Sequence, residues 1–178
     1  YLHDSFKFTV NAGYGIEVRK STGVLIENNI LYNLYSPLMI NSGSVGCVVG
    51  YNFIHLTHNN DPTFMIYAIS GGHGAHPMMN LYEGNVASRF QSDFYWGSSS
   101  HQTLFRNFFH GTEAGAIANR SCVAFDGLSR SNNVVGNVLG ESLLRQRLPA
   151  ADDLGGVVNL ELVVFVLEQI LYAAADVG

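Results

Sequence analysis

A short motif recurs five times along the chain, and it constrains the fold more than any other feature. Each copy has two or three apolar residues, two spacer residues, an asparagine and a further apolar residue. Successive asparagines are separated by 23, 33, 22 and 30 residues, which indicates a repeating coil of about 22 residues with insertions in two coils. A repeat of this length is typical of a solenoid of short stacked strands. The five asparagines are Asn29, Asn52, Asn85, Asn107 and Asn137.

Asparagine has a physical reason to recur in this motif. A sharp turn between two strands of one coil needs a residue that tolerates the left-handed backbone region, as Asn does. Asparagine amides in stacked coils can also hydrogen-bond along a column. We therefore interpret the five asparagines as architectural. Leucine at Asn85 or Asn107 is expected to destabilise the fold, because it would have to adopt a positive φ.

A second strand-like run precedes most copies of the motif and is followed by a turn of small residues. No stretch between residues 14 and 140 has the sustained spacing of apolar residues expected of a helix. The sequence therefore predicts an all-β parallel β-helix of about five coils, and it disfavours an α/β fold or an antiparallel sandwich. The runs are residues 15–18, 36–40, 64–69, 93–96 and 123–126.

In its coil length and its asparagine-turn motif, the segment 10–140 resembles the pectate-lyase-like superfamily of right-handed parallel β-helix proteins. That superfamily contains pectate, pectin and alginate lyases, polygalacturonases and many phage tailspikes. The resemblance implies a right-handed solenoid. It implies a polysaccharide partner only as an expectation, because one fold can host unrelated chemistries.

The last segment, residues 141–178, does not contain the motif. A Leu-, Val- and Ala-rich run at 157–175 includes Glu161 and Glu168, so a membrane span is not expected. The segment is either a cap over an open end of the solenoid or a tail that is not native to the fold. The predicted organisation is thus a β-helix at 1–140, part of a longer solenoid, followed by this C-terminal segment.

Charge and cysteine usage exclude several classes of function. The net charge of −5 and only nine Lys and Arg argue against a nucleic-acid partner. Cys47 and Cys122 fall three coils apart in the predicted register, or about 14 Å, which is too far for a disulfide. Neither cysteine has the spacing of a zinc site, so both are expected to be free thiols.

The most distinctive local segment is 70–77, which includes Gly-His-Gly at 72–74 and His76. Lengthened turns in solenoids often form the binding face. Gly-His-Gly also looks like one motif of polygalacturonases, but the acidic residues of preceding coils and the later Arg-x-Lys of that family are missing. His73 is therefore a candidate catalytic residue without the family's partners.

Three further residues fall at comparable places in successive coils, namely His76, His101 and Arg130. An arginine can neutralise a sugar carboxylate while a neutral histidine abstracts a proton, as β-elimination from a uronic acid requires. With His73, these residues are the predicted catalytic set. The alternative is that the histidines are simply solvated turn residues.

A polar and aromatic strand face is the predicted substrate-binding surface. Aromatic rings stack on the C–H faces of sugars while neighbouring polar groups bind hydroxyls. The expected outward residues are Tyr67, Asp93, Tyr95 and Asp126, with Asn41 beside them. Phe94, Trp96, Ile40 and Phe125 are expected to point into the core.

The sequence favours an extracellular or cell-surface protein that binds or cleaves a polysaccharide, as a lyase or a glycoside hydrolase if it is an enzyme. The alternative is a non-catalytic structural or adhesive segment of a surface protein or tailspike. No Asp-rich cluster predicts a metal site, although calcium, common among lyases of this superfamily, stays open. Convergence of His73, His76 and His101 in one groove would favour the enzyme.

Overall fold

The computed structural model describes residues 1–5 and 13–140, and these residues form strands and no helix. The strands form three sheets in which every recorded pairing is parallel. The first sheet contains β1 (Leu2–His3), β4 (Ile30–Tyr35), β7 (Phe53–His58), β10 (Val86–Ala87), β13 (Phe108–Phe109) and β16 (Val138–Leu139). The second contains β2 (Ile16–Arg19), β5 (Leu38–Asn41), β8 (Ile69–Gly72), β11 (Phe90–Ser92) and β14 (Val123–Phe125). The third contains β3 (Leu25–Glu27), β6 (Val48–Gly50), β9 (Leu81–Glu83), β12 (Thr103–Phe105) and β15 (Asn133–Val135).

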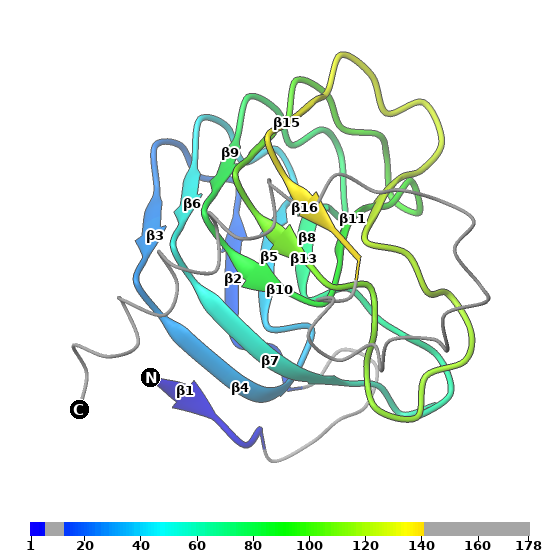
Figure 1. Ribbon diagram of the computed structural model, residues 1–178. Helices are drawn as coiled ribbons and strands as arrows, with labels where there is room; N and C mark the ends of the chain where they lie inside the picture. The colour runs from blue at the N-terminus through cyan, green and yellow to red at the C-terminus, as the bar shows by residue number, and fades with distance from the viewer. Residues whose placement is uncertain (6–12, 141–178) are drawn as a thin grey trace. The chain divides into compact units, whose positions relative to one another are not determined.

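From β2 onward the chain repeats one path, passing from the second sheet to the third and then to the first. Each of the five passages, called coils one to five below, adds one strand to every sheet, so the coils stack from the blue to the yellow end of the trace (Figure 1). This arrangement is compatible with the predicted parallel β-helix, and the all-β prediction is confirmed. The predicted segment 141–178 lies outside the described residues.

The two expected insertions occur where each coil passes from the first sheet to the second. They are residues 59–68, between β7 and β8, and residues 110–122, between β13 and β14. They account for the long asparagine intervals of 33 and 30 residues. The His73 turn, 73–80, was expected to be longer than its neighbours, but the turn 93–102 of the next coil is longer still.

The core consists of apolar side chains stacked at equivalent positions of successive coils. In the third sheet one such column runs through Ile26, Val49, Tyr82 and Leu104, which pair in register. Because alternate strand residues face opposite sides of a sheet, one side chain in two enters the interior. The second sheet supplies Leu38, Ile69 and Phe90 to the same core, and the first supplies Leu31, Ile54 and Phe109.

The five motif asparagines form the predicted hydrogen-bonded ladder. In each of the first four asparagines, the Nδ2 group donates to Oδ1 of the asparagine in the next coil, over 2.9–3.0 Å. The backbone N–H of the same four residues donates to the same oxygen. In the last four asparagines, Nδ2 also donates to a carbonyl of the preceding coil. Asn52, Asn85 and Asn107 are at most 1% exposed. The architectural interpretation is therefore confirmed.

The backbone reason given for the asparagines is wrong. The residue with positive φ is the one before each ladder asparagine: Asn28, Tyr51, Gly84, Arg106 and Gly136. A second set with positive φ lies five positions earlier in each coil: Gly23, Gly46, Met79, His101 and Ser131. These left-handed residues make the two corners on either side of the short strands of the third sheet. The ladder asparagines are selected by their buried side-chain hydrogen bonds rather than by their own φ.

Both cysteines are free, as predicted. Cys47 is fully buried just before β6, and Cys122 lies just before β14, three coils further on. Burial raises the pKa of the Cys122 thiol, which keeps it protonated and weakly nucleophilic.

Gly71 in β8 shows how tightly the coils are packed. A Cβ atom at this position would lie 2.2 Å from Cζ of Phe90 and 3.2 Å from the hydroxyl of Tyr82. We expect Gly71→Ala to lower the free energy of unfolding by about 2 kcal/mol, because a small-to-large change in a packed core displaces its neighbours. Urea denaturation followed by circular dichroism measures this change.

Gly50→Ala in β6 is the matched control for Gly71→Ala. A Cβ atom at Gly50 would make only ordinary contacts, the nearest at 3.9 Å. Its stability should change by less than about 1 kcal/mol in either direction. Equal losses for the two variants would contradict the role assigned to packing around Phe90.

Candidate functional site

A groove with a volume of about 510 Å³ lies over the outer face of the second sheet. Its residues come from four successive coils. Tyr14, Glu17 and Arg19 belong to the first coil, Met39, Asn41 and Ser42 to the second, His73 and Gly74 to the third, and Trp96 to the fourth. They lie in or beside the strands of the second sheet and in the turns that follow them, so the groove crosses several strands.

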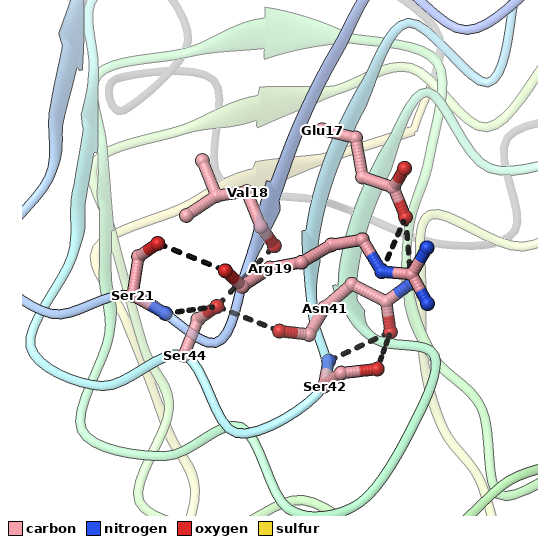
Figure 2. Close-up of polar contacts among 7 residues, drawn as sticks. All are labelled: Glu17, Val18, Arg19, Ser21, Asn41, Ser42 and Ser44. Carbon is pink, nitrogen blue, oxygen red and sulfur yellow. Dashed lines mark hydrogen bonds and ion pairs between the residues drawn. The ribbon is translucent and has the colours of Figure 1, made fainter.

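The floor of the groove at the first two coils is polar. Asn41 Nδ2 donates to Glu17 Oε1 over 2.9 Å, and Arg19 Nε lies 3.6 Å from the same oxygen. Figure 2 shows the Glu17 and Arg19 side chains on one side of β2, with Val18 pointing away from them. The Arg19 side chain is 61% exposed, so its guanidinium can reach a ligand while remaining close to Glu17.

The adjoining turn holds Asn41 in place. The backbone N–H of Ser42 donates to Asn41 Oδ1 over 2.7 Å, and its hydroxyl donates to the same oxygen over 3.3 Å. The buried Ser44 hydroxyl contacts the carbonyls of Asn41 and Val18, which joins the first two coils (Figure 2). The amide of Asn41 is thus fixed with its NH₂ group toward Glu17.

His73, which lines the groove, is hydrogen-bonded to Asp93. His73 Nδ1 lies 2.6 Å from Asp93 Oδ2, and the two side chains are 25% and 15% exposed. The other carboxylate oxygen, Oδ1, accepts the backbone N–H of Tyr95 over 3.0 Å, which orients the carboxylate. A neutral His73 that donates its Nδ1 proton to Asp93 has a lone pair on Nε2, the form of a general base.

The glycines around His73 bring this pair close to the groove floor. Gly74 has φ of 146°, and a Cβ atom there would lie 2.5 Å from Ser42 Oγ and 2.7 Å from Asn41 Oδ1. Only glycine permits both this backbone conformation and this close approach. The Gly-His-Gly sequence therefore has a local structural cause.

The segment 93–98 is a loop rather than the predicted strand, since β11 ends at Ser92. Phe94 and Trp96 were expected in the core, but they are 62% and 64% exposed, and Tyr95 is 74% exposed. Phe94 instead packs over Gly127 of the next coil. Core positions are taken by Phe90 and Phe125, whose rings lie 5.5 Å apart. Ile40 and Phe125 point inward as predicted.

Two tyrosines flank the polar floor. Burial raises the pKa of Tyr14, and Tyr35 and Glu17 raise it further, so Tyr14 is a neutral hydroxyl at physiological pH. Burial, to which Asp93 and Tyr14 add, also raises the pKa of Tyr67 well above its ordinary value. Tyr67, predicted to be an exposed binding residue, is only partly exposed and is not among the residues that line the groove.

Asp93 and Asp126 occupy equivalent positions in neighbouring coils. Each follows the last residue of a second-sheet strand, and their backbone N–H groups donate to Gly72 O and Ser92 O respectively. In the sequence, the two aspartates lie at different distances from the next ladder asparagine, because the turn 93–102 is three residues longer than the turn 126–132. Asp126 accepts a hydrogen bond from Gln91 Nε2 over 2.5 Å.

The other predicted catalytic residues lie in the turns that connect the second sheet to the third in three successive coils, His76 in 73–80, His101 in 93–102 and Arg130 in 126–132. Ser100 Oγ is 2.9 Å from both His76 Nε2 and His101 Nδ1. The backbone of Ser100 forms an isolated parallel β-bridge with that of Arg130 in the next coil. Ser100 is only 1% exposed. His76, His101 and Arg130 do not line the groove that contains His73, so the predicted catalytic set divides into two groups.

Sequence reasoning missed Tyr14, Glu17 and Arg19 as groove residues. The available signal was the alternation of Glu17 and Arg19 with Val18 in the first strand, which places both charged residues on the outer face. His73 and Asp93 also share a position relative to the second sheet, since each directly follows the last residue of its strand, β8 or β11. Their distances to the next ladder asparagine differ, which hides this equivalence in the sequence.

Among residues 1–5 and 13–140, no group of three or more His, Cys, Asp or Glu side chains could hold a metal ion. The same residues contain no helix long and apolar enough to cross a membrane. Comparisons with family models, with characterised proteins and with solved structures gave no significant match to this chain. The site must therefore be interpreted from its own geometry.

Proposed function

We propose that this chain is a right-handed β-helix of the pectate-lyase-like type, exposed outside the cell or on its surface, that binds and cleaves a uronic-acid polysaccharide. The observation that supports cleavage best is the His73–Asp93 pair beside the groove, with 2.6 Å between Nδ1 and Oδ2. Arg19, Tyr14 and Trp96 line the same groove and supply a cation, a neutral hydroxyl and an aromatic ring.

The proposed reaction is β-elimination. Arg19 binds the carboxylate of the uronate, which makes the neighbouring C5 proton more acidic. Nε2 of His73 takes that proton while Asp93 stabilises the imidazolium that forms. The C5–H and C4–O bonds break, a C4=C5 double bond forms, and the leaving oxygen takes a proton from the Tyr14 hydroxyl. Because His73 and Tyr14 then exchange a proton with water, the cycle closes without a redox partner.

A non-catalytic adhesive or structural solenoid is the second candidate. The exposed aromatic loop 94–96 favours it, because rings open to solvent can hold a glycan without any proton transfer. His76, His101 and Arg130 lie away from the groove, so they add nothing to a catalytic site there. An adhesive solenoid that binds a polysaccharide differs from the proposed enzyme in turnover, whereas a purely structural solenoid binds no polysaccharide.

Incubation with a panel of uronic-acid polymers tests the proposal. At least one polymer is expected to give the absorbance of an unsaturated uronate together with new reducing ends. Reducing ends without that absorbance would indicate hydrolysis and overturn β-elimination. Binding to a glycan array, with neither unsaturated uronate nor new reducing ends, would overturn cleavage and favour the adhesive candidate.

A further inference from the structure

The most exposed apolar side chains of the described residues gather on two neighbouring turns. Among residues 1–5 and 13–140, six large apolar side chains are at least 62% exposed. Four of them lie in the turns that follow β11 and β14, in the fourth and fifth coils. They are Phe94, Tyr95 and Trp96, 62–74% exposed, and Leu128, 86% exposed. These four residues are called the turn patch below.

Contacts between the two turns make the patch continuous. The Phe94 ring lies over Gly127, where an added Cβ atom would be 2.8 Å from Cγ of the ring. Leu128 follows Gly127 directly in the chain. The rings of Tyr95 and Trp96 meet edge-on, with centroids 4.8 Å apart. The four apolar side chains therefore form one surface across two coils.

The tips of both turns are uncharged. Neither residues 94–100 nor residues 127–129 include a charged side chain. The carboxylates at the start of the two turns, Asp93 and Asp126, are each hydrogen-bonded within the protein. Moving an ionised group out of water is very costly, whereas the side chains of these tips are apolar or small and polar. The tips can therefore enter an apolar phase without taking a charge with them.

Backbone groups of the tips are partly paired within each turn. The N–H of Gly97 donates to the carbonyl of Phe94, and the N–H of Ser129 donates to that of Asp126, each over 3.3 Å. Unpaired backbone groups make an irregular segment costly to remove from water. Internal pairing lowers that cost for both turns.

The size and composition of the turn patch favour a lipid surface over a protein partner. A fully buried aromatic side chain loses about 150–250 Å² of surface, so the three rings at their observed exposures offer roughly 400 Å². A stable protein interface buries about 800 Å² on each partner. Tryptophan and tyrosine are also the residues that concentrate at the boundary between lipid headgroups and acyl chains.

We propose that the turn patch is a peripheral membrane anchor, which inserts its four apolar side chains into the interfacial region of a zwitterionic phospholipid bilayer. The exposed Arg130, on the same turn as Leu128, is available to a lipid phosphate. The net charge of −5 opposes accumulation at an anionic surface, so binding depends on apolar insertion. Trp96 also lines the groove, so the anchor places the groove beside the lipid surface. The anchor does not depend on the reaction proposed above.

Trp96 is the single tryptophan of the chain, so its intrinsic fluorescence reports directly on the patch. Titration of the full chain with phosphatidylcholine vesicles should shift its emission to shorter wavelength. Phosphatidylcholine brominated on the acyl chains should quench that emission. Vesicles that also contain phosphatidylserine should bind no more tightly. Binding that appears only with the anionic lipid would overturn the proposal, because charge rather than insertion would then cause it.

The deciding variant combines Tyr95→Ser with Leu128→Ser, which removes half of the patch and keeps the fluorescent ring. Its partition coefficient onto phosphatidylcholine vesicles should fall by about tenfold or more, since binding scales with buried apolar area. Its melting temperature should stay close to that of the parent chain, because both side chains are largely exposed. Ile117→Ser is the matched control: Ile117 is 80% exposed but lies in the insertion 110–122, so its loss should leave vesicle binding unchanged.

Three results would overturn the anchor and leave the cleavage assays unaffected. The first is an unshifted Trp96 emission at the highest vesicle concentration. The second is an equal loss of binding in the double variant and in Ile117→Ser, since any exposed apolar side chain would then serve. The third is self-association of the chain without vesicles that the double variant abolishes, which would assign the turn patch to a second copy.

Discussion

Replacing Asn85 by leucine is expected to lower the free energy of unfolding by about 3–6 kcal/mol. Asn85 is fully buried, and its amide bonds to Asn52, Asn107 and the carbonyl of Val49. Leucine removes every one of these partners at once. Each buried polar group that loses its partner costs about 1–3 kcal/mol, partly offset by apolar burial. Urea denaturation of the full chain measures the loss.

Asn29→Leu is the matched control, since Asn29 stands at the first coil of the same ladder and is only partly buried. Its loss should be less than half that of Asn85→Leu, because water can reach the groups left behind. Equal effects would show that the ladder amides are not the source of stability. The outcome does not depend on a positive φ at Asn85, which the backbone does not have.

His73→Ala is expected to lower kcat on a cleaved polymer by about 10²- to 10⁴-fold, the usual contribution of a general base. Asp93→Asn keeps an acceptor for Nδ1–H but removes the charge that stabilises the imidazolium, so a smaller loss of about tenfold or more is expected. Steady-state rates of unsaturated product formation measure both. The melting temperature of each variant should stay close to that of the parent chain.

His101→Ala tests the division of the predicted catalytic residues. His101 does not line the groove, and its ring contacts Ser100 rather than His73 or Asp93, so its removal should leave kcat within about twofold of the parent value. A loss of kcat as large as that of His73→Ala would show that the reaction does not take place in the groove. His55→Ala, on the exposed face of β7, controls for loss of a surface imidazole.

The repeat could be predicted from the sequence because an asparagine occupies the same hydrogen-bonded position in every coil, and the three central ones are buried. The register of the second-sheet strands was harder to predict, because turns of different length separate these strands from the ladder asparagines. Asp93 and Asp126 are equivalent in space although their distances to the next ladder asparagine differ by three residues.

The solvent exposure of the aromatic residues 94–96 could not be predicted from their hydrophobicity. Apolar rings at alternate positions suggest core residues, but β11 already supplies Phe90 to the core three residues before the turn begins. The following rings are then left on the surface. Groove residues such as Tyr14 carry no repeat signal, since a binding site uses each position once.

The four amide-to-amide links of the ladder all point the same way, because in each of them Nδ2 donates to Oδ1 of the asparagine in the following coil. Aligned amide dipoles polarise one another, so each added link strengthens those before it. Loss of one asparagine therefore removes its own link and also weakens the links on either side of it, so the ladder contributes to stability as a unit.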